Sequence, residues 1–136
     1  MDHVVLDEQR QGIYTTVSWS PRMDPIVQYL IINREILALG HGVLAAQAAH
    51  AAVAGYLIAA DSDSARVWAG GTFTKIILAV EDEGALRGLS SQLASAGIAH
   101  KLLEESRLQG KATAIGVAPL PKSAVAPFFS RLSLLR

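Results

Sequence analysis

The 136-residue sequence contains no cysteine, which excludes a disulfide framework, a thiolate nucleophile and a cysteine-ligated metal site. Aromatic residues make up only 6% of the chain and charged residues 18%, whereas hydrophobic residues make up 51%. This composition indicates a globular domain, and the length fits one domain with a sizeable core. The formal net charge is zero, which is not typical of a strong nucleic-acid binder. The absence of cysteine fits a reducing setting, so we expect a cytoplasmic protein.

The sequence also lacks clear signs of a membrane or secretory segment. Its opening, MDHVVLDEQR, is acidic and has no long apolar core, so we expect no secretory signal. The longest apolar run, residues 43–60, approaches membrane-spanning length but is mostly alanine and contains Gln47 and His50. We therefore expect a buried helix of a soluble protein, without a membrane partner.

Charge is unevenly distributed along the chain. Residues 1–100 carry six basic and ten acidic residues, whereas residues 101–136 carry six basic and two acidic residues. A basic C-terminal third favours contact with a polyanion. On charge alone, however, an ordinary solvated surface is the better interpretation.

Hydrophobic patterning predicts alternating strands and helices. Strands are expected over residues 26–33, 73–80, 98–105 and 112–119, and helices over residues 43–60, 65–69, 81–97 and 121–132, with residues 34–42 as a loop. This order predicts an α/β fold: a single, three-layer domain over residues 26–136, with a four-stranded mixed sheet flanked by helices. The short link between the last two strands predicts that they pair antiparallel. Residues 1–25 are interpreted as an N-terminal extension or arm.

Two polar residues interrupt the alanine-rich helix. Gln47 and His50 are three positions apart, so they share one helical face, which Ala51 and Ala54 continue with small side chains. Small residues there would let a substrate or another backbone approach closely. On spacing alone, such residues more often satisfy buried backbone groups or line a crevice than carry chemistry.

A Gly-His-Gly sequence, Gly40-His41-Gly42, precedes this helix. Free N–H groups at a helix N-terminus could hold a phosphate or a developing oxyanion. The motif fits neither a P-loop nor a dinucleotide-binding loop, so spacing alone favours a plain loop histidine. No metal-ligand spacing, no cofactor motif and no GxSxG nucleophile are present, so a hydrolytic reaction would use activated water.

A loop joins the ends of the last two predicted strands. Glu104 and Glu105 lie before this loop, and Lys111 and Thr113 lie after it. Such connections often carry function. A solvated turn is nevertheless the simpler interpretation from the sequence.

These segments together resemble a known family. VQYLIINREILALGHGVLAAQAAHAAVAGY is similar to the opening of the type 2 peptidyl-tRNA hydrolases, in which a strand and a Gly/Lys loop precede a helix with Ala-Ala-Gln-x-x-His-Ala. TKIILAV, GIAHKLLEE and TAIGVAP are similar to the later strands of that family. The resemblance covers residues 26–136. It is closer still to a divergent subgroup, the peptidyl-tRNA hydrolase domain-containing proteins, which share the Pro-x-Pro before the last helix, here at residues 119–121.

The resemblance implies the peptidyl-tRNA hydrolase type 2 fold and activity. The activity is hydrolysis of the ester between a peptide, or an N-blocked amino acid, and the 3′ ribose of tRNA. The first loop lysine of the family, held to be catalytic, falls on His41 here, and the second falls on Val43. Glu105 falls nearest the catalytic aspartate. The positions that match the family are Gln47, His50, Lys75 and Thr113.

We therefore expect two groups of site residues and no metal or cofactor. The expected catalytic residues are His41, Glu105, Gln47, His50 and Thr113, and the expected substrate-binding residues are Gly40, Gly42, Lys75, Lys101, Arg107 and Lys111. Glu105 or His41 would be the base for water, and N–H groups near Gly42, or Gln47, would hold the oxyanion. The expected partner is tRNA or peptidyl-tRNA, and by resemblance two copies would form a homodimer.

Two other functions stay open. The altered lysine and aspartate positions are also what a catalytically inactive RNA-binding or protein-interaction module on the same fold would have. Without the resemblance, the β-α-β-β run over residues 73–119 would fit a small-molecule regulatory domain.

Overall fold

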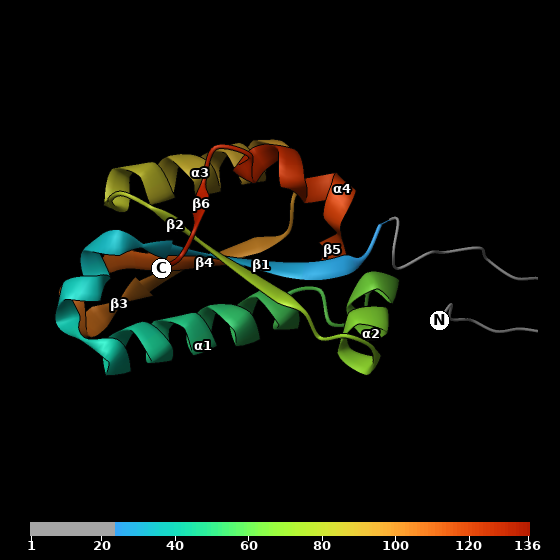
Figure 1. Ribbon diagram of the computed structural model, residues 1–136, viewed down its shortest axis with the longest axis horizontal. Coiled ribbons are helices and arrows are strands. Elements are labelled where there is room, and N and C mark those ends of the chain that lie inside the picture. The colour runs from blue at the N-terminus through green and yellow to red at the C-terminus, as the bar shows by residue number, and fades with distance from the viewer. Residues whose placement is uncertain (1–23) are drawn as a thin grey trace, which may run out of the picture.

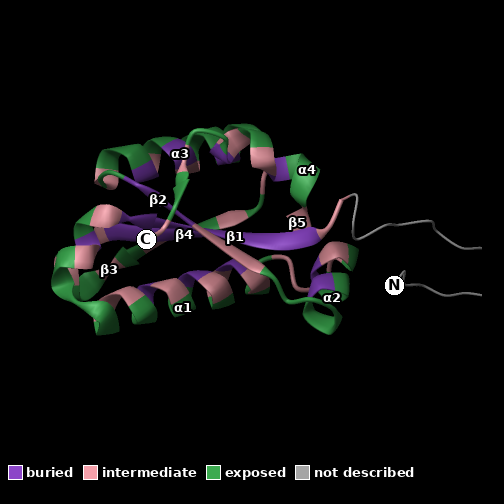
Figure 2. Ribbon diagram, viewed as in Figure 1, coloured by how far each residue is buried: buried purple, intermediate pink, exposed green. Residues whose placement is uncertain are grey.

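The computed structural model describes residues 24–136, with strand β1 (Ile26–Asn33) at the centre of its sheet. All eight residues of β1 are buried, as expected for a β-branched apolar run covered on both faces (Figure 2). The N-terminal extension predicted over residues 1–25 falls almost wholly outside the described residues. Within them, the first two, Asp24 and Pro25, already contact the domain: Lys122 N–H donates to the Pro25 carbonyl at 2.8 Å.

The mixed sheet has six strands, and the prediction of four was wrong. The other five are β2 (Lys75–Val80), β3 (His100–Glu105), β4 (Lys111–Val117), β5 (Leu120–Pro121) and β6 (Ser133–Leu134). The order is β3-β4-β1-β2-β6, and β5 also pairs with β1. Only β1 and β2 pair in parallel among the described strands; β3 and β4 pair antiparallel, as predicted. The two added strands have two residues each, which is too short for a recognisable sequence pattern.

Helices cover both faces of the sheet. They are α1 (His41–Leu57), α2 (Asp63–Gly70), α3 (Glu83–Ser95) and α4 (Lys122–Val125), with 3₁₀ turns η1 (Arg34–Leu39), η2 (Ser106–Leu108) and η3 (Ala126–Phe129). Helix α1 lies on one face, and α3 and α4 lie on the other, which gives the predicted three layers (Figure 1). The α/β class and the single domain are confirmed.

Two local predictions need correction. The predicted loop over residues 34–42 is mostly the turn η1, in which Asn33 accepts a hydrogen bond from Glu35 N–H as an N-cap. The predicted last helix over residues 121–132 stops after one turn, at Val125, and continues as η3. Pro127 lies at the start of η3, where its missing N–H and fixed φ prevent continuation of an α-helix.

The two core clusters differ in side-chain size. The face below α3 and α4 packs large residues such as Leu86, Leu93 and Phe129. The face below α1 has only a few buried apolar residues, and Ala51 and Ala114 are among them. Helix α1 therefore lies very close to the sheet.

Glycine permits this close approach of α1 to β4. A Cβ added at Gly116 would overlap the Ala51 carbonyl, and a Cβ at Gly55 would lie 2.7 Å from the Gly116 carbonyl carbon. Real Cβ atoms do not come that close to a backbone. Both positions therefore require glycine for packing.

Helix α1 is half-exposed, so the prediction of a fully buried helix was wrong. Gln47, Ala51 and Gly55 are its only buried residues, spaced four apart on the face toward the sheet. Large apolar side chains on its outer face, Val53 and Leu57, are 58% and 64% exposed. Within residues 24–136, no helix combines the length and the hydropathy needed to cross a bilayer.

Candidate active site

Gln47 is the buried polar residue of α1, with 4% of its surface exposed. Its side-chain Oε1 accepts a hydrogen bond from the Thr113 hydroxyl at 2.5 Å. Its Nε2 donates to Glu105 Oε1 at 2.8 Å. These three residues form a hydrogen-bonded chain, the Thr113–Gln47–Glu105 chain, between α1, β4 and β3.

A β-bulge brings Thr113 into this chain. Leu103 on β3 pairs with Ala114 on β4, but the next residue, Glu104, pairs with Ala112, so Thr113 is the extra residue. Thr113 and Ala114 consequently both face α1, contrary to strand alternation. Bulges commonly re-aim a side chain next to a functional site. The bulge is not recognisable from the sequence, although Thr113 was expected on other grounds.

Glu105 is held as a carboxylate. Its side chain is 15% exposed, and its Oε2 accepts a hydrogen bond from the Arg107 backbone N–H at 3.1 Å. That bond, followed by the one from Gln47, holds the pKa of Glu105 below its ordinary value, and the charges of Arg107 and His50 add to the effect. Glu105 is therefore ionised at neutral pH, with donors on both of its oxygens.

The N-terminus of α1 is open beside this chain. Gly40 is the N-cap, at φ 103°, and it has no side chain to cap the first N–H groups of the helix. The first α-helical hydrogen bond runs from Leu44 N–H to Gly40 C=O. The N–H groups of His41, Gly42 and Val43 are thus directed outward, where an anion can meet them.

Both expected histidines are exposed on α1. His41 is the first residue of the helix, and His50 lies one turn beyond Gln47 on the side of Glu105. The structure thus gathers Glu105, Gln47 and Thr113 with the open helix end, and His50 lies within electrostatic range of Glu105.

The expected substrate-binding lysines are dispersed. Lys75 pairs with Gln28 near the start of β1, five residues from the Asn33 end where the site lies, so it is about 17 Å away along the strand. Lys101 is exposed on β3, four residues before Glu105. Arg107 lies two residues after Glu105, in η2, and its side chain is 89% exposed.

Lys111 is engaged by carboxylates rather than free for phosphate. Its Nζ lies 3.0 Å from Glu35 Oε1 and 3.8 Å from Glu83 Oε1. Glu83 also pairs with Arg87, which in turn pairs with Glu104 at 2.8 Å. The hydrogen bond from Lys111 lowers the pKa of Glu35, and the pairing with Glu35 raises that of Lys111. The pKa of Glu83 is lowered by a hydrogen bond from the Ala112 backbone N–H at 3.0 Å, followed by the one from Arg87.

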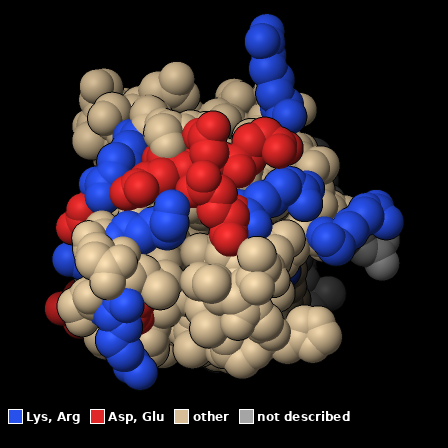
Figure 3. Space-filling model, turned by 90° about the vertical axis from the view of Figure 1, so that its left-hand side faces the viewer, with Lys and Arg blue, Asp and Glu red and all other residues tan. Residues whose placement is uncertain are grey.

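We call these five residues, Glu35, Glu83, Arg87, Glu104 and Lys111, the charged network. Acidic side chains gather over this end of the molecule, with basic side chains beside them (Figure 3). The network joins η1, α3, β3 and β4 next to the open end of α1. Sequence reasoning missed it, because its members are far apart in the chain and carry no common motif.

The comparisons with known proteins agree with this arrangement. The model of the family "Peptidyl-tRNA hydrolase PTH2" matches residues 26–135. A protein of Schizosaccharomyces pombe named "Probable peptidyl-tRNA hydrolase 2" is 35% identical over 102 residues, which is 71% of this chain. The aligned region spans only 50% of that relative. The match includes residues 73–119, so these residues belong to the same family domain as the rest of the matched region. Fold, site and family match together establish that the chain belongs to the peptidyl-tRNA hydrolase PTH2 family.

Proposed function

We propose that this protein hydrolyses the ester between a peptide, or an N-blocked amino acid, and the 3′ ribose of tRNA. The observation that carries the proposal is the Thr113–Gln47–Glu105 chain, which lies beside the uncapped N-terminus of α1 in a protein of this family. Ester hydrolysis needs an oriented water, donors for an oxyanion and an acceptor for one proton. This end of the molecule offers all three.

The carboxylate of Glu105 would hold the attacking water. Gln47 and the Arg107 N–H fix its position, and its lowered pKa keeps it ionised but makes it a weak proton acceptor. We assign the acceptance of the water proton, before it passes to the ribose oxygen, to His50, because a neutral imidazole has a free nitrogen that accepts a proton and His50 lies within electrostatic range of Glu105.

The open end of α1 would stabilise the reaction intermediate. As the water oxygen bonds to the ester carbon, the carbonyl oxygen becomes an oxyanion, which the N–H groups of Gly42 and Val43 can meet. The C–O bond to the ribose then breaks, and the ribose oxygen takes up the proton. The products are a free peptide acid and tRNA. His41, in the place of a family lysine, would face the substrate as the first residue of the helix.

The test is release of tRNA from an N-acetylated aminoacyl-tRNA by the purified protein. Glu105→Gln keeps the shape of the side chain but removes the charge, and we expect kcat/KM to fall about 100-fold. The matched control is Glu104→Gln, because Glu104 is the next residue on β3 but pairs with Arg87 on the opposite face. Equal rates for Glu105→Gln and the unmodified protein would contradict the assignment. His50→Asn and His41→Asn, measured separately, distinguish the two imidazoles.

A second function, an inactive RNA-binding module, is favoured by one observation. His41 and Val43 replace the two loop lysines, and the nearby Lys111 is neutralised by Glu35 and Glu83. Salt-sensitive tRNA binding without turnover would support the module over the enzyme. Absence of both tRNA binding and turnover would contradict both proposed functions.

Two further proposals are a cytoplasmic location, which rests on the absence of cysteine, and a homodimer, which rests on the resemblance to the family. Light scattering at several protein concentrations measures the oligomer directly. A tagged copy imaged in cells measures the location.

A further inference from the structure

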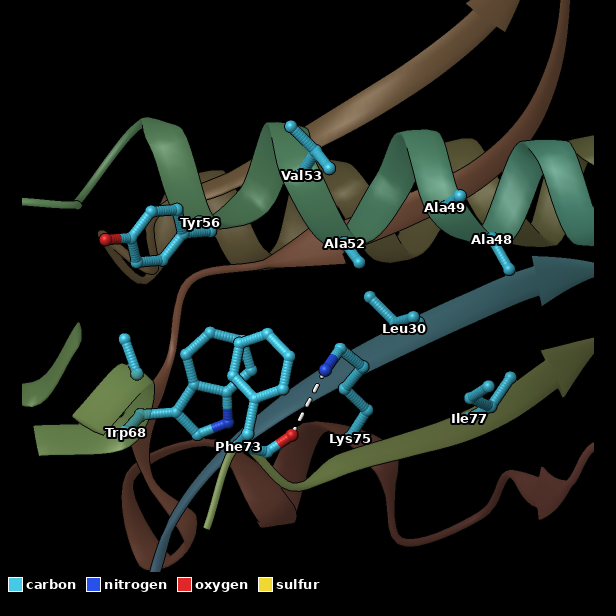
Figure 4. A pocket seen from close by; sticks show the side chains of 11 residues that line it. Leu30, Ala48, Ala49, Ala52, Val53, Tyr56, Trp68, Phe73, Lys75 and Ile77 are labelled. Carbon is cyan, nitrogen blue, oxygen red and sulfur yellow. Dashed lines mark hydrogen bonds between the residues drawn. The ribbon is translucent and has the colours of Figure 1, made fainter. Parts of the chain in front are cut away.

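A second concave site lies at the far end of α1, away from the Thr113–Gln47–Glu105 chain. It is a pocket of about 580 Å³ between α1, α2 and the start of β2. Figure 4 shows Ala52, Val53 and Tyr56 of α1 on one side and Trp68 and Phe73 on the other. Volume and lining are typical of sites for small molecules with an apolar body.

Lys75 is the single charged residue that lines this pocket. Its ammonium lies 3.4 Å from the centre of the Phe73 ring and 5.0 Å from that of the Trp68 ring. It donates one hydrogen bond, to the Phe73 carbonyl at 3.1 Å. Within residues 24–136 no carboxylate pairs with it, so two of its three N–H donors have only ring faces and solvent. Burial alone lowers the pKa of Lys75, which indicates that its charge has little compensation.

The aromatic wall is held in place by backbone contacts. Phe73 has φ of 60°, a left-handed conformation that is a genuine outlier for a bulky residue. Its N–H donates to the Trp68 carbonyl at 3.1 Å, and the Trp68 indole N–H donates to the Thr74 carbonyl at 2.7 Å. Strained backbone of this kind tends to occur at ligand clamps. It holds a ring that is 54% exposed over the pocket.

The geometry points to a binding site for an amphipathic carboxylate: a small molecule whose alkyl or aryl body fills the apolar pocket and whose carboxylate pairs with Lys75. The charge of Lys75 selects the anion, and the apolar lining selects the body. The pocket lies at the opposite end of β1 from the candidate active site, so this site is separate from ester hydrolysis.

The test uses decanoate, decan-1-ol and decylamine, which share one alkyl body but differ in the charge of the head. The chain has two tryptophans, so a Trp19→Phe background leaves Trp68, which lines the pocket, as the sole tryptophan. We expect a saturable change of Trp68 fluorescence with decanoate, at least tenfold tighter than with decan-1-ol, and none with decylamine.

Two pairs of variants test separately how the head group and the alkyl body of the ligand contribute to binding. Lys75→Met should weaken the affinity for decanoate at least tenfold and leave the affinity for decan-1-ol unchanged. Lys122→Met, at an exposed lysine of α4, should change neither affinity. Ala49→Phe fills the pocket and should abolish binding, whereas Ala94→Phe, at an exposed alanine of α3, should not. Circular dichroism melting shows which variants stay folded.

Four outcomes would overturn the proposal. The first three are equal affinity for decanoate and decan-1-ol, decanoate binding that survives Lys75→Met, and no saturable binding at all. Decanoate affinity that falls as the protein concentration rises would mean that a second copy fills the pocket, and would overturn it as well.

Discussion

At the scale of single residues, Glu105 and the hydroxyl of Thr113 together fix which way the buried amide of Gln47 faces. Because an ionised carboxylate can only accept hydrogen bonds, Gln47 presents its NH₂ group to Glu105 and its Oε1 to the donating hydroxyl of Thr113. The negative charge of Glu105 favours the same orientation. One β-bulge residue on β4 thereby helps to align, through Gln47, a carboxylate on the neighbouring strand β3.

The first prediction concerns this hydroxyl. Thr113→Val keeps the shape but leaves Gln47 Oε1 buried without a donor, which should cost about 1–3 kcal/mol of unfolding free energy. It should also lower kcat/KM for an N-blocked aminoacyl-tRNA about tenfold, because Gln47 is then free to turn. Urea unfolding and the tRNA-release assay measure the two effects. Thr113→Ser keeps the hydroxyl donor and should retain most of the unfolding free energy and most of kcat/KM. A Thr113→Ser variant as inactive as Thr113→Val would contradict the role of the hydroxyl.

The second prediction concerns pH. The pKa of Glu105 in the folded protein lies below its ordinary value of 4.5, so the folded state binds this proton less tightly than the unfolded chain. The stabilisation is therefore complete above about pH 4.5 and is lost as the pH falls through the lowered pKa. The urea midpoint should drop less between pH 7 and pH 3 in Glu105→Gln than in the unmodified protein. Between pH 7 and pH 8 the urea midpoints of the two proteins should not diverge. An equal fall of both midpoints between pH 7 and pH 3 would refute the lowered pKa of Glu105.

The resemblance to the family predicted part of this site, which spacing alone did not. Gln47, Glu105 and Thr113 were expected from the resemblance, and the structure joins them by hydrogen bonds. Lys75 was expected at the same site but lies at the other end of β1. Strand register decides that distance, and register depends on pairing between segments that are far apart in the sequence.

At the scale of elements, the contact between α1 and β4 leaves almost no space for an added side-chain atom. Gly116 faces the Ala51 carbonyl, so the helix backbone rests directly on the strand. The alanine-rich composition of α1 follows from this contact on its inner face. The sequence revealed small residues on that helix, but their partner on β4 emerged only from the fold.

The third prediction tests this contact. Gly116→Ala places a Cβ against the Ala51 carbonyl, so α1 must move away from the sheet, at a cost of about 3 kcal/mol or more. Differential scanning calorimetry should show a clear loss of Tm. Gly88→Ala on α3 is the matched control, because nothing lies within 4 Å of the added Cβ. It should be neutral or stabilising by up to about 1 kcal/mol. Similar Tm values for both variants would rule out the close approach.

Long periodic elements were predictable and short ones were not. The bounds of β1 agree with the prediction, because a run with six apolar residues in eight positions forms a clear signal. The strands β5 and β6 have two residues each and exist only because β1 and β2 offer them hydrogen bonds. Such pairing is a tertiary effect that no local pattern carries.

At the scale of the whole molecule, the two ends of the domain differ in chemistry. The charged network and the Thr113–Gln47–Glu105 chain lie at one end, and the apolar pocket with Lys75 lies at the other. The basic C-terminal third of the sequence does not become a uniform basic face. Lys111 is used within the charged network, whereas Lys101 is exposed and no carboxylate pairs with it in the described part of the chain.

The fourth prediction follows from this difference. Lys101→Met should weaken tRNA binding and reduce the slope of log affinity against log salt by about one, as expected for a lost phosphate contact. Lys111→Met should leave the slope unchanged, because that charge is already neutralised by Glu35 and Glu83. Filter binding at several salt concentrations measures the slope. Equal changes of the slope in the two variants would refute the assignment of a phosphate contact to Lys101 but not to Lys111.

The strand β6 has a consequence for self-association. Ser133 and Leu134 pair with the outer side of β2, and Leu135 N–H donates to the Ile77 carbonyl at 3.0 Å. Without these residues β2 would be an edge of six mostly apolar residues with unpaired backbone groups, to which a strand of another molecule could add. Two residues from a distant part of the chain thus protect the domain against edge-to-edge aggregation.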